Sequence, residues 1–414
     1  MTPRELRGKV IAETCTITKV GRLWHVPSQS GNGTYSVNLE RTYCSCPDFI
    51  EYGHDCKHIF AVRFTVSKTE RHADGSETTT TVTVEKRKTY PQQWSAYNAS
   101  QVNELRHFQA FLADLCATLP TPAPRRGQQP MRPADAAFCS IFKVYSTMSA
   151  RRFMGDLEEA KESGYVSRVP HFNSVLNFLD TEAATETLQS FVDLSAAPLA
   201  GIERSFAVDS TGFAGASHVR WFDEKYGRPR EEVRWVKLHA MVGVTTNVVV
   251  SCKVMEKSSA DAIQFPELVA DAAERFQVDE VSADKAYTSG KNFATTDAIG
   301  ARFYPAFKKN ATGQAGGSYE KAFLLMKLNE EAYAEKYHKR SNVEATFSAI
   351  KRLFGPSLRS KNELAMRNEA LAKVVCFNLT CVIHAMYELG IDTEFVLKPR
   401  CTTNGSTAHQ ITQN

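Results

Sequence analysis

Three cysteines and one histidine near the start of the chain have types and spacing that suit a metal ion. Cys44 and Cys46 stand one residue apart, and after nine further residues Cys56 and His58 repeat that spacing. Three thiolates and an imidazole match tetrahedral Zn²⁺, and each close pair can hold the ion from one turn or strand end. Four protein ligands close the coordination shell, so we predict one structural zinc ion here.

Two other interpretations of this cluster stay open. The cysteines could be free thiols in a core or a redox pair, and His54 could replace His58 as the fourth ligand. We prefer His58 because it gives two symmetrical pairs. Ten cysteines in a chain whose N-terminus lacks the apolar core of a signal peptide favour a reducing compartment and argue against secretion.

Two aspartates occupy positions where ligands and catalytic groups gather in α/β proteins. Asp209 is the only charged residue of FAVDSTGF, where an apolar strand runs into a glycine-containing turn, and Asp284 has the same kind of position in VDEVSADKAY. We expect both carboxylates at the C-terminal edge of a strand. Aspartate also initiates turns, so neither residue alone specifies a site.

A glutamate supplies a third carboxylate within a more specific pattern. In YHKRSNVEATFSAIKRLFG, predicted as a helix, four polar residues fall within an arc of roughly 60° on one face: Tyr337, Arg340, Glu344 and Lys351. The alternative is a solvated face with an Arg340–Glu344 ion pair. Such a face has no need of the tyrosine, and an adjacent apolar stripe can dock the helix: Val343, Phe347, Ile350 and Phe354. We therefore expect the polar face to line a site.

These residues carry a resemblance to a known family. Tyrosine, two residues, arginine, three residues, glutamate, six residues and lysine form the signature of DDE insertion-sequence transposases, of the families numbered four and five. Tyr337, Arg340, Glu344 and Lys351 match it in full. The segments VDST and SADKAYTSGKNF resemble the first and second aspartate motifs of the same family, in the same order, so the resemblance spans residues 203–355.

The resemblance implies an α/β fold of the ribonuclease H type, a mixed sheet flanked by helices, with Asp209, Asp284 and Glu344 as the catalytic residues. Three carboxylates can hold two Mg²⁺ or Mn²⁺ ions, which activate a water or a 3′-hydroxyl and stabilise the leaving oxygen during attack on a phosphodiester. Arg340 and Lys351 are suited to contact phosphates beside the scissile bond. Tyr337 could stack on, or hydrogen-bond to, a nucleotide at the DNA end.

The cysteine and histidine pattern resembles the SWIM zinc finger, a small module found with DNA-associated proteins and fused to some transposases. All four ligand positions match. The partner of such a finger could be DNA or protein.

The surrounding sequence predicts five segments. Strands alternate with helices from Ile202 onward, which indicates an α/β layer architecture, and a stretch with five prolines, PTPAPRRGQQPMRP, is the best candidate boundary. The first segments are a strand-rich zinc finger over 1–65 and a polar hairpin, helix and proline-rich linker over 66–133, with ADGSE at 73–77 as the turn of the hairpin. A helical DNA-end-binding module over 134–201, the catalytic domain over 202–390 and a C-terminal tail over 391–414 follow. We expect one long helical segment over about 319–353 and another over about 363–389.

The helical module and the sheet hold further candidates. Arg151, Arg152 and Arg168 could contact phosphates in the module at 134–201, although ion pairs with Glu158, Glu159 and Glu162 would serve equally well. Arg151 and Arg152 should begin a helix after Ser149, and a helix near Ser95 should start from a serine cap. His239 is interpreted as a satisfied strand histidine and left out of the site.

Charge supports a nucleic-acid partner only locally. The net charge is +4, which establishes no partner by itself, but residues 335–373 hold nine lysines or arginines against four acidic residues. Next to a phosphodiester site we interpret this stretch as a DNA track. The apolar stretch 370–386 is interrupted by polar residues, which favours a buried helix over a membrane span.

We therefore expect a prokaryotic transposase of the cytoplasm, associated with the nucleoid, that acts on DNA at transposon ends and targets as a homodimer or larger assembly, away from membranes. Two alternatives are a domesticated DNA-binding regulator and a metal-dependent nuclease without strand transfer. An intact set of Asp209, Asp284, Glu344 and Lys351 argues against the regulator, whereas the nuclease would use the same carboxylates.

Overall fold

The computed structural model describes most of the chain. The described residues are 2–29, 33–71, 77–81, 93–123, 126–127, 130–215, 234–256, 261–308, 310–391, 393 and 395. They form two compact units, Met1–Pro91 and Gln92–Asn414. The predicted turn at 73–77 lies almost wholly outside the described residues, as does nearly all of the predicted tail at 391–414.

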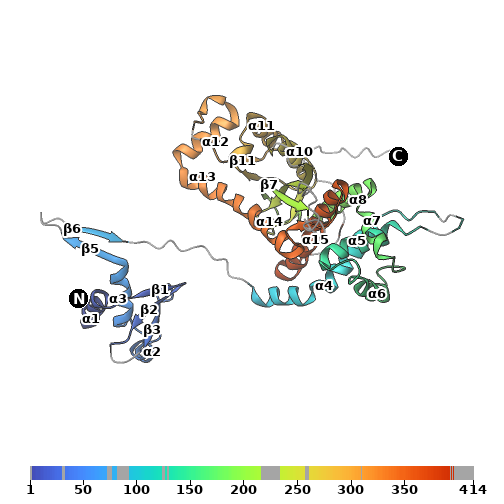
Figure 1. The fold of residues 1–414 in the computed structure, drawn as a ribbon. Helices are drawn as coiled ribbons and strands as arrows, with labels where there is room; N and C mark the ends of the chain where they lie inside the picture. Colours follow the sequence, from blue (N-terminus) through green and yellow to red (C-terminus); the bar gives the residue numbers. More distant parts are fainter. Residues whose placement is uncertain are drawn as a thin grey trace, which may run out of the picture. The chain divides into compact units, whose positions relative to one another are not determined.

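The first unit combines a small antiparallel sheet with short helices (Figure 1). The strands follow one another in space as in the chain: β1 (Thr18–Val20), β2 (Leu23–Pro27), β3 (Thr34–Asn38) and β4 (Tyr43–Cys44). The helices are α1 (Pro3–Thr14), α2 (Pro47–Tyr52) and α3 (Lys57–Val66). Ile11, Val26, Val37, Ile59 and Val62 form its core together with the clustered cysteines. The sequence predicted the strands; it did not predict α1.

A hairpin follows α3. Strands β5 (Ser67–Arg71) and β6 (Glu77–Thr81) pair antiparallel, as the polar, threonine-rich sequence predicted.

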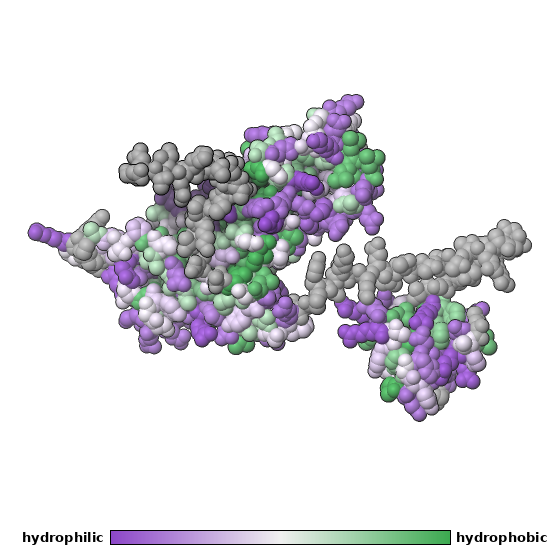
Figure 2. Space-filling view, turned by 180° about the vertical axis from the view of Figure 1, so that it is seen from behind, coloured by the Kyte–Doolittle hydropathy of each residue, from purple (hydrophilic) through white to green (hydrophobic). Residues whose placement is uncertain are grey.

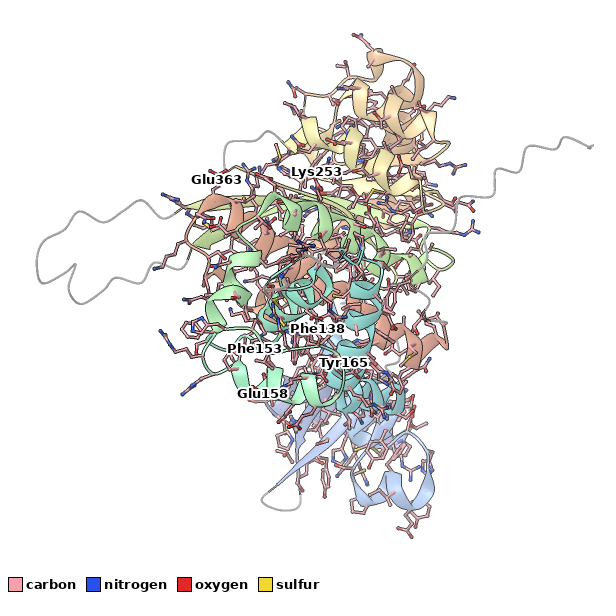
Figure 3. All side chains as sticks on the ribbon, turned by 90° about the vertical axis from the view of Figure 1, so that its right-hand side faces the viewer. Phe138, Phe153, Glu158, Tyr165, Lys253 and Glu363 are labelled. Carbon is pink, nitrogen blue, oxygen red and sulfur yellow. The ribbon has the colours of Figure 1, made fainter. Side chains whose placement is uncertain are left out.

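Helices form the start of the second unit. They are α4 (Trp94–Ala117), α5 (Pro133–Ser146), α6 (Met154–Glu162), α7 (Phe172–Phe178), α8 (Glu182–Ala196) and the 3₁₀ turn η1 (Ala197–Leu199). Aromatic rings fill the space between them. Phe138 stacks on Tyr165, both labelled in Figure 3, and Phe142 meets Phe153 edge to face. α4 packs on α5 and on the last helix of the chain, so α4 belongs to the second unit. The proline-rich stretch that follows α4 therefore lies within the second unit and not at its boundary.

Two predicted helix starts are wrong. Ser95 does not cap α4, which begins one residue earlier, after Gln93, without a side-chain cap. Arg151 and Arg152 lie in a turn that precedes α6, because that helix begins only at Met154.

A mixed sheet forms the centre of the second unit. Its strands lie in the order β11 (Arg302–Pro305), β10 (Glu280–Ala283), β7 (Ser205–Gly215), β8 (Trp235–Gly243) and β9 (Val249–Glu256), and the short β12 (Ser357–Leu358) also pairs with β7. β8 and β9 are antiparallel to their neighbours, whereas β10, β11 and β12 run parallel to theirs. This is the predicted α/β fold of the ribonuclease H type, a mixed sheet flanked by helices.

Helices cover both faces of this sheet. α10 (Asp261–Ala273) packs on β8 and β9 from one face, while α14 (Ser341–Phe354) lies against β7 and β8 from the other. Neighbouring residues of β7 show the division: Ser210 bonds to Asp261 of α10, and Thr211 bonds to Lys351 of α14. Successive side chains of a strand point to opposite faces, so the two bonds identify the two sides.

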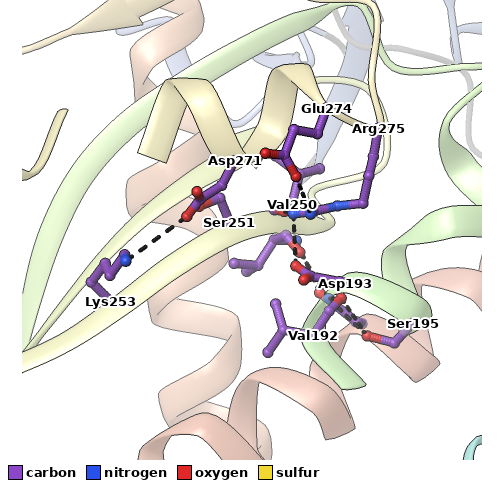
Figure 4. Close-up of polar contacts among 11 residues, drawn as sticks. Val192, Asp193, Ser195, Val250, Ser251, Lys253, Asp271, Glu274 and Arg275 are labelled. Atoms are coloured by element: carbon purple, nitrogen blue, oxygen red, sulfur yellow. Dashed lines mark hydrogen bonds and ion pairs between the residues drawn. The ribbon is translucent and has the colours of Figure 1, made fainter. Parts of the chain in front are cut away.

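An arginine ties α10 to elements from other parts of the chain. Arg275, just after α10, donates to the carbonyl oxygen of Val250 on β9 and pairs with Asp193 of α8 at 2.7 Å (Figure 4). Burial raises the pKa of Asp193 to about 6.

The last helix, α15 (Glu363–Leu389), has the bounds that the sequence predicted. It is long and apolar enough to cross a membrane, but most of it is buried against α8, α4 and α5. The interior amide of Asn378 accepts from the backbone of Val249 and donates to it, which joins α15 to the sheet. Such burial is typical of a core helix.

On the face of the second unit shown in Figure 2, hydrophilic residues cover most of the surface and apolar patches lie between them.

The long helical segment predicted over 319–353 is helical but divided. The chain forms α12 (Gly317–Leu328), α13 (Glu330–Tyr337), the 3₁₀ turn η4 (His338–Arg340) and α14. Asn329 causes the first break, because its non-helical backbone ends α12 while its side chain accepts from the amide of Ala332 and caps α13.

Candidate functional sites

The zinc-ligand candidates converge in the first unit. Cys44 ends β4, Cys46 precedes α2, and Cys56 and His58 stand at the start of α3. All four side chains are buried, and their ligand atoms lie within 4.8 Å of one another. The Nδ1 atom of His58 is 3.9 Å from the sulfur of Cys44 and 3.9 Å from that of Cys56. The geometry is that of a Cys₃His zinc site.

The alternative ligand does not reach this cluster. His54 is exposed, and its Nδ1 atom lies 3.0 Å from the carbonyl oxygen of Tyr52. A hydrogen bond from the Cys44 thiol lowers the pKa of Cys56 to about 4, and the same contact raises the pKa of Cys44. A thiol that deprotonates readily suits zinc, because the ligand is the thiolate.

Helix α1 supports the helix that carries His58. A Cβ atom added to Gly8 would meet the Cβ of Phe60 at 2.5 Å, so only glycine lets the two helices approach this closely. On the other side, the ring of Tyr35 lies 4.7 Å from that of His58.

The first two carboxylates of the proposed acidic site stand at the same level of the sheet. β10 pairs parallel with β7, and its last residue, Ala283, is opposite Val208. Asp284 directly follows Ala283, and Asp209 directly follows Val208. Asp284 therefore ends its strand as predicted, but Asp209 lies in the middle of β7 rather than at its edge, because β8 and β12 extend the pairing of β7 to Gly215.

Arg340 joins the third carboxylate to this pair. One of its terminal nitrogens donates to Oδ2 of Asp209 at 2.9 Å, and the other donates to Oε1 of Glu344 at 2.6 Å. Oδ1 of Asp209 accepts from the backbone N–H of Ser210 at 2.8 Å. Glu344 occupies the first turn of α14, with 58% of its side chain exposed against 21% for Asp209.

The electrostatics of Asp209 show that the acidic groups act on one another. Burial raises the pKa of Asp209, and the negative charges of Asp284 and Glu344 add to that rise; the Ser210 amide and Arg340 oppose it. A cation placed among these carboxylates would oppose the rise in the pKa of Asp209 and favour its charged form.

The remaining signature residues are arranged differently from the prediction. Lys351 donates to the hydroxyl of Thr211 at 2.7 Å and lies 5.3 Å from the ring centroid of Phe213. Tyr337 ends α13, and Arg340 belongs to the following 3₁₀ turn, so these two residues do not share one continuous α-helix with Glu344. The predicted contact between Arg340 and Glu344 is nevertheless formed.

Much of the basic stretch at 335–373 is engaged within the protein. Lys336 and Lys339 both pair with Glu280, Arg367 pairs with Glu363, and Lys373 is buried. Its exposed cations include Arg352 and Lys361. The stretch therefore offers fewer phosphate contacts than its composition suggested.

The arginines of the helical module lie near its surface. The guanidinium of Arg151 lies 4.6 Å from the ring centroid of Phe172, and Arg152 and Arg168 are exposed. Glu158, one of the predicted ion-pair partners, lies 4.0 Å from Lys161 instead. In Figure 3, Glu158 is at the outer side of this module.

A polar cluster on the opposite face of β7 was missed by the sequence analysis. The carboxylate of Asp261 accepts from Lys237 at 2.5 Å and from Ser210 at 3.1 Å, and lies 3.5 Å from Nδ1 of His239. His239 is fully buried, as expected for a strand histidine. The signal that could have found the cluster is the position of Ser210, directly beside Asp209 but on the other face of the strand.

Comparison with protein families matches two parts of the chain. Residues 201–379 match the model described as a transposase DDE domain, and residues 35–62 match the SWIM zinc finger. No curated protein matches the chain. The first match contains all three carboxylates, and the second contains all four residues of the Cys₃His cluster.

Proposed function

We propose that this chain, which carries a transposase DDE domain fused to a SWIM zinc finger, cleaves DNA at the terminal inverted repeats of an insertion sequence and joins the freed ends to a target. The family matches agree with the resemblance found in the sequence. They support transposase-type chemistry in general, and the cut-and-paste reaction at specific ends is our proposal.

The observation that carries the proposal is the convergence on Asp209. Asp284 follows the neighbouring parallel strand at the same level, and Arg340 bridges Asp209 to Glu344. Residues from β7, β10 and α14 thus come together although they are far apart in the sequence. Burial raises the pKa of Asp209 and the charges of Asp284 and Glu344 add to the rise, so a cation bound beside it would stabilise its charged form.

The donor set fits divalent metal ions. Asp209, Asp284 and Glu344 offer hard carboxylate oxygens, which Mg²⁺ and Mn²⁺ prefer, and we assign them as the catalytic metal ligands. Bound there, two such ions would supply activation of the attacking hydroxyl and neutralisation of charge at the phosphate.

The protein's own residues would position the DNA. Arg340 presents a planar fork that matches two phosphate oxygens. The ammonium of Lys351 on α14, held by Thr211 and Phe213, adds a point charge. Tyr337, next to Arg340, is placed to meet an end nucleotide. The helical module at 134–201 would bind the transposon end through Arg151, Arg152 and Arg168.

The zinc-binding unit has a structural role in this proposal. Cys44, Cys46, Cys56 and His58 occupy all four positions of a tetrahedral site, so we assign one Zn²⁺ ion that stabilises the fold and takes no part in cleavage. The synaptic complex would hold two or more copies of the chain on DNA, in the nucleoid of a prokaryote.

A cleavage and joining assay tests the function. Candidate end DNA is incubated with Mg²⁺ and the full chain, and the wild type is compared with Asp209→Ala and Glu344→Ala. We expect both variants to lose activity by several orders of magnitude. Glu363→Ala is the matched control, because Glu363 forms the same Arg–Glu contact of 2.6 Å on α15, away from the carboxylates.

Three outcomes discriminate the alternatives. Cleavage that persists in both variants would remove the assigned carboxylates from the mechanism. Cleavage without joining in the wild type would indicate a nuclease. DNA binding with no metal-dependent reaction would indicate a regulator that has kept the fold.

A further inference from the structure

The contacts of Arg340 raise a question about how the acidic site accepts cations. Its guanidinium donates to both Asp209 and Glu344, at 2.9 and 2.6 Å, and its side chain is 21% exposed. The positive group therefore stands between two carboxylates to which the proposed function assigns metal ions. Among the described residues, Arg340 is the ion-pair partner of both Asp209 and Glu344.

A guanidinium and a divalent cation compete in this position. Both are attracted by the same carboxylate oxygens, and like charges only a few ångströms apart repel each other strongly in a partly buried site. Mg²⁺ binds oxygens at about 2.0–2.1 Å, so an ion on Oδ2 of Asp209 would lie close to the nitrogen that now donates there. Occupancy by one cation thus disfavours the other.

DNA offers Arg340 a different partner. Phosphate oxygens accept two parallel N–H bonds from a guanidinium, in the same way as a carboxylate does. A strand entering the site would draw the guanidinium away from Asp209 and Glu344 and would leave these carboxylates to the metal ions.

We propose that Arg340 holds Asp209 and Glu344 in place of divalent cations until DNA arrives, so that DNA binding and metal binding at this site are positively coupled. The proposal rests on the function proposed above and adds its regulation. By linkage, DNA must increase the affinity for the metal by the same factor by which the metal increases the affinity for DNA. The consequence is that, without DNA, the protein binds few divalent ions at these carboxylates.

The test measures Mn²⁺ binding rather than catalysis. The zinc-loaded full chain is titrated with Mn²⁺ without DNA, and free Mn²⁺ is read by electron paramagnetic resonance. We expect Arg340→Gln to bind Mn²⁺ about tenfold more tightly than the wild type, because the competing charge is gone. Arg367→Gln, which removes an Arg–Glu contact of the same length on α15, should bind as the wild type does.

A second arm adds short duplex DNA of mixed sequence at low ionic strength. The wild type should bind Mn²⁺ more tightly with DNA, and Arg340→Gln should gain much less. Equal affinity of the wild type and Arg340→Gln without DNA overturns the proposal, and so does an equal gain from DNA in both. If Arg340→Gln does not fold, Arg340→Met decides, because it also removes the positive charge: tighter binding than the wild type supports competition, and equal or weaker binding overturns it.

Asp284→Ala separates this inference from the function beneath it. The hydrogen bonds of Arg340 go to Asp209 and Glu344 and not to Asp284, so Asp284→Ala should remove Mn²⁺ binding while the Arg340 contacts stay in place. Wild-type Mn²⁺ binding in Asp284→Ala would show that the proposed metal site itself is wrong. Lost binding in Asp284→Ala, together with an unchanged Arg340→Gln, would overturn only the coupling.

Discussion

Lys351 and Lys373, from the two consecutive helices α14 and α15, place their ammonium groups on the ring of the same residue, Phe213 of β7. The distances from Nζ to the ring centroid are 5.3 and 5.4 Å. Lys373 also donates to the carbonyl oxygens of Gly355 and Ser357, at 2.8 Å each, and so fixes the turn that joins the two helices. Lys351 in the proposed site thus shares its aromatic ring with a lysine that is only 1% exposed.

The buried state of Lys373 predicts a pH dependence. Burial lowers its pKa from 10.5 to about 8 in the folded protein. Between these two values the unfolded chain binds more protons than the folded one, so the free energy of unfolding rises with pH across this window. The slope contributed by one group is at most about 1.4 kcal/mol per pH unit.

Denaturant unfolding of the second unit in this window measures the slope. Lys373→Met should lack it, whereas Lys361→Met, a change at an exposed lysine just before α15, should retain it. Parallel pH profiles for the wild type and Lys373→Met would contradict the prediction.

The zinc cluster predicts independent loss of the first unit. Cys44→Ser should abolish binding of one zinc ion per chain, because the remaining ligands leave the tetrahedral site open. The first unit should then unfold, while the melting of the second unit is unchanged, since each unit has its own core. Elemental analysis and thermal unfolding report the two effects.

Cys15→Ser is the control for this change, because Cys15 belongs to the same unit but lies outside the cluster. It should keep its zinc. A zinc-free wild type, purified without chelator, would be incompatible with the assignment.

The lysine pair on Glu280 predicts a loss of stability in acid. Burial alone would raise the pKa of Glu280, but hydrogen bonds from Lys336 and Lys339 outweigh it and hold the pKa below the ordinary value of 4.5. Their contribution is therefore present above pH 4.5 and is lost as the pH falls through the lower, folded-state value. Glu280→Gln should cost about 1–2 kcal/mol at neutral pH, and the difference from the wild type should shrink in acid.

Chemical denaturation at neutral and acid pH checks this expectation. Glu274→Gln removes a mostly exposed carboxylate and should change the free energy of unfolding by less than about 0.5 kcal/mol. A difference for Glu280→Gln that stays constant down to low pH would show that the lysine contacts do not stabilise the charged carboxylate.

Gly243 predicts a steric effect in the sheet. A Cβ atom there would meet the carboxyl carbon of Glu203 at 2.4 Å. Glu203 is fully buried and accepts from the backbone amides of Thr245 and Thr246, so it has no room to move without losing these bonds. We expect Gly243→Ala to lower the free energy of unfolding by about 2–4 kcal/mol.

A second glycine serves as the comparison. Gly155 lies inside α6 and has open space around an added Cβ, so Gly155→Ala should be neutral or stabilising by up to about 1 kcal/mol. Thermal unfolding of both variants tests the contrast, and similar melting temperatures would refute the steric argument.

Local patterns in the sequence predicted the parts of the structure that depend on local physics. The paired spacing of Cys44, Cys46, Cys56 and His58 was enough to foresee a cluster, because neighbouring ligands are placed by a single turn. The apolar run of α15 likewise gave its bounds, with Asn362 capping the amide of Ala365.

What the sequence could not predict depends on partners far along the chain. Asp209 was expected at the end of a strand, but pairing with β8 and β12 extends β7 beyond it. The helix through Tyr337 was expected to continue into α14, yet η4 interrupts it where Lys339 turns toward Glu280. The proline-rich stretch was chosen as a domain boundary from composition, while the packing of α4 on α15 places that stretch inside the second unit. The finer division into five segments stays a prediction.

The position of β10 has a consequence for incomplete copies of the chain. β7, β8 and β9 pair in chain order. β10 pairs with the other edge of β7, so the chain must first cross the sheet through α10, and α14 follows later in the sequence. Contacts between distant segments form late in folding. A chain that is still being synthesised, or whose gene is interrupted before Ser341, therefore has two of the three carboxylates at most. If these residues act as proposed, such a fragment cannot cut the DNA of its host, and only a finished copy becomes a mobile one.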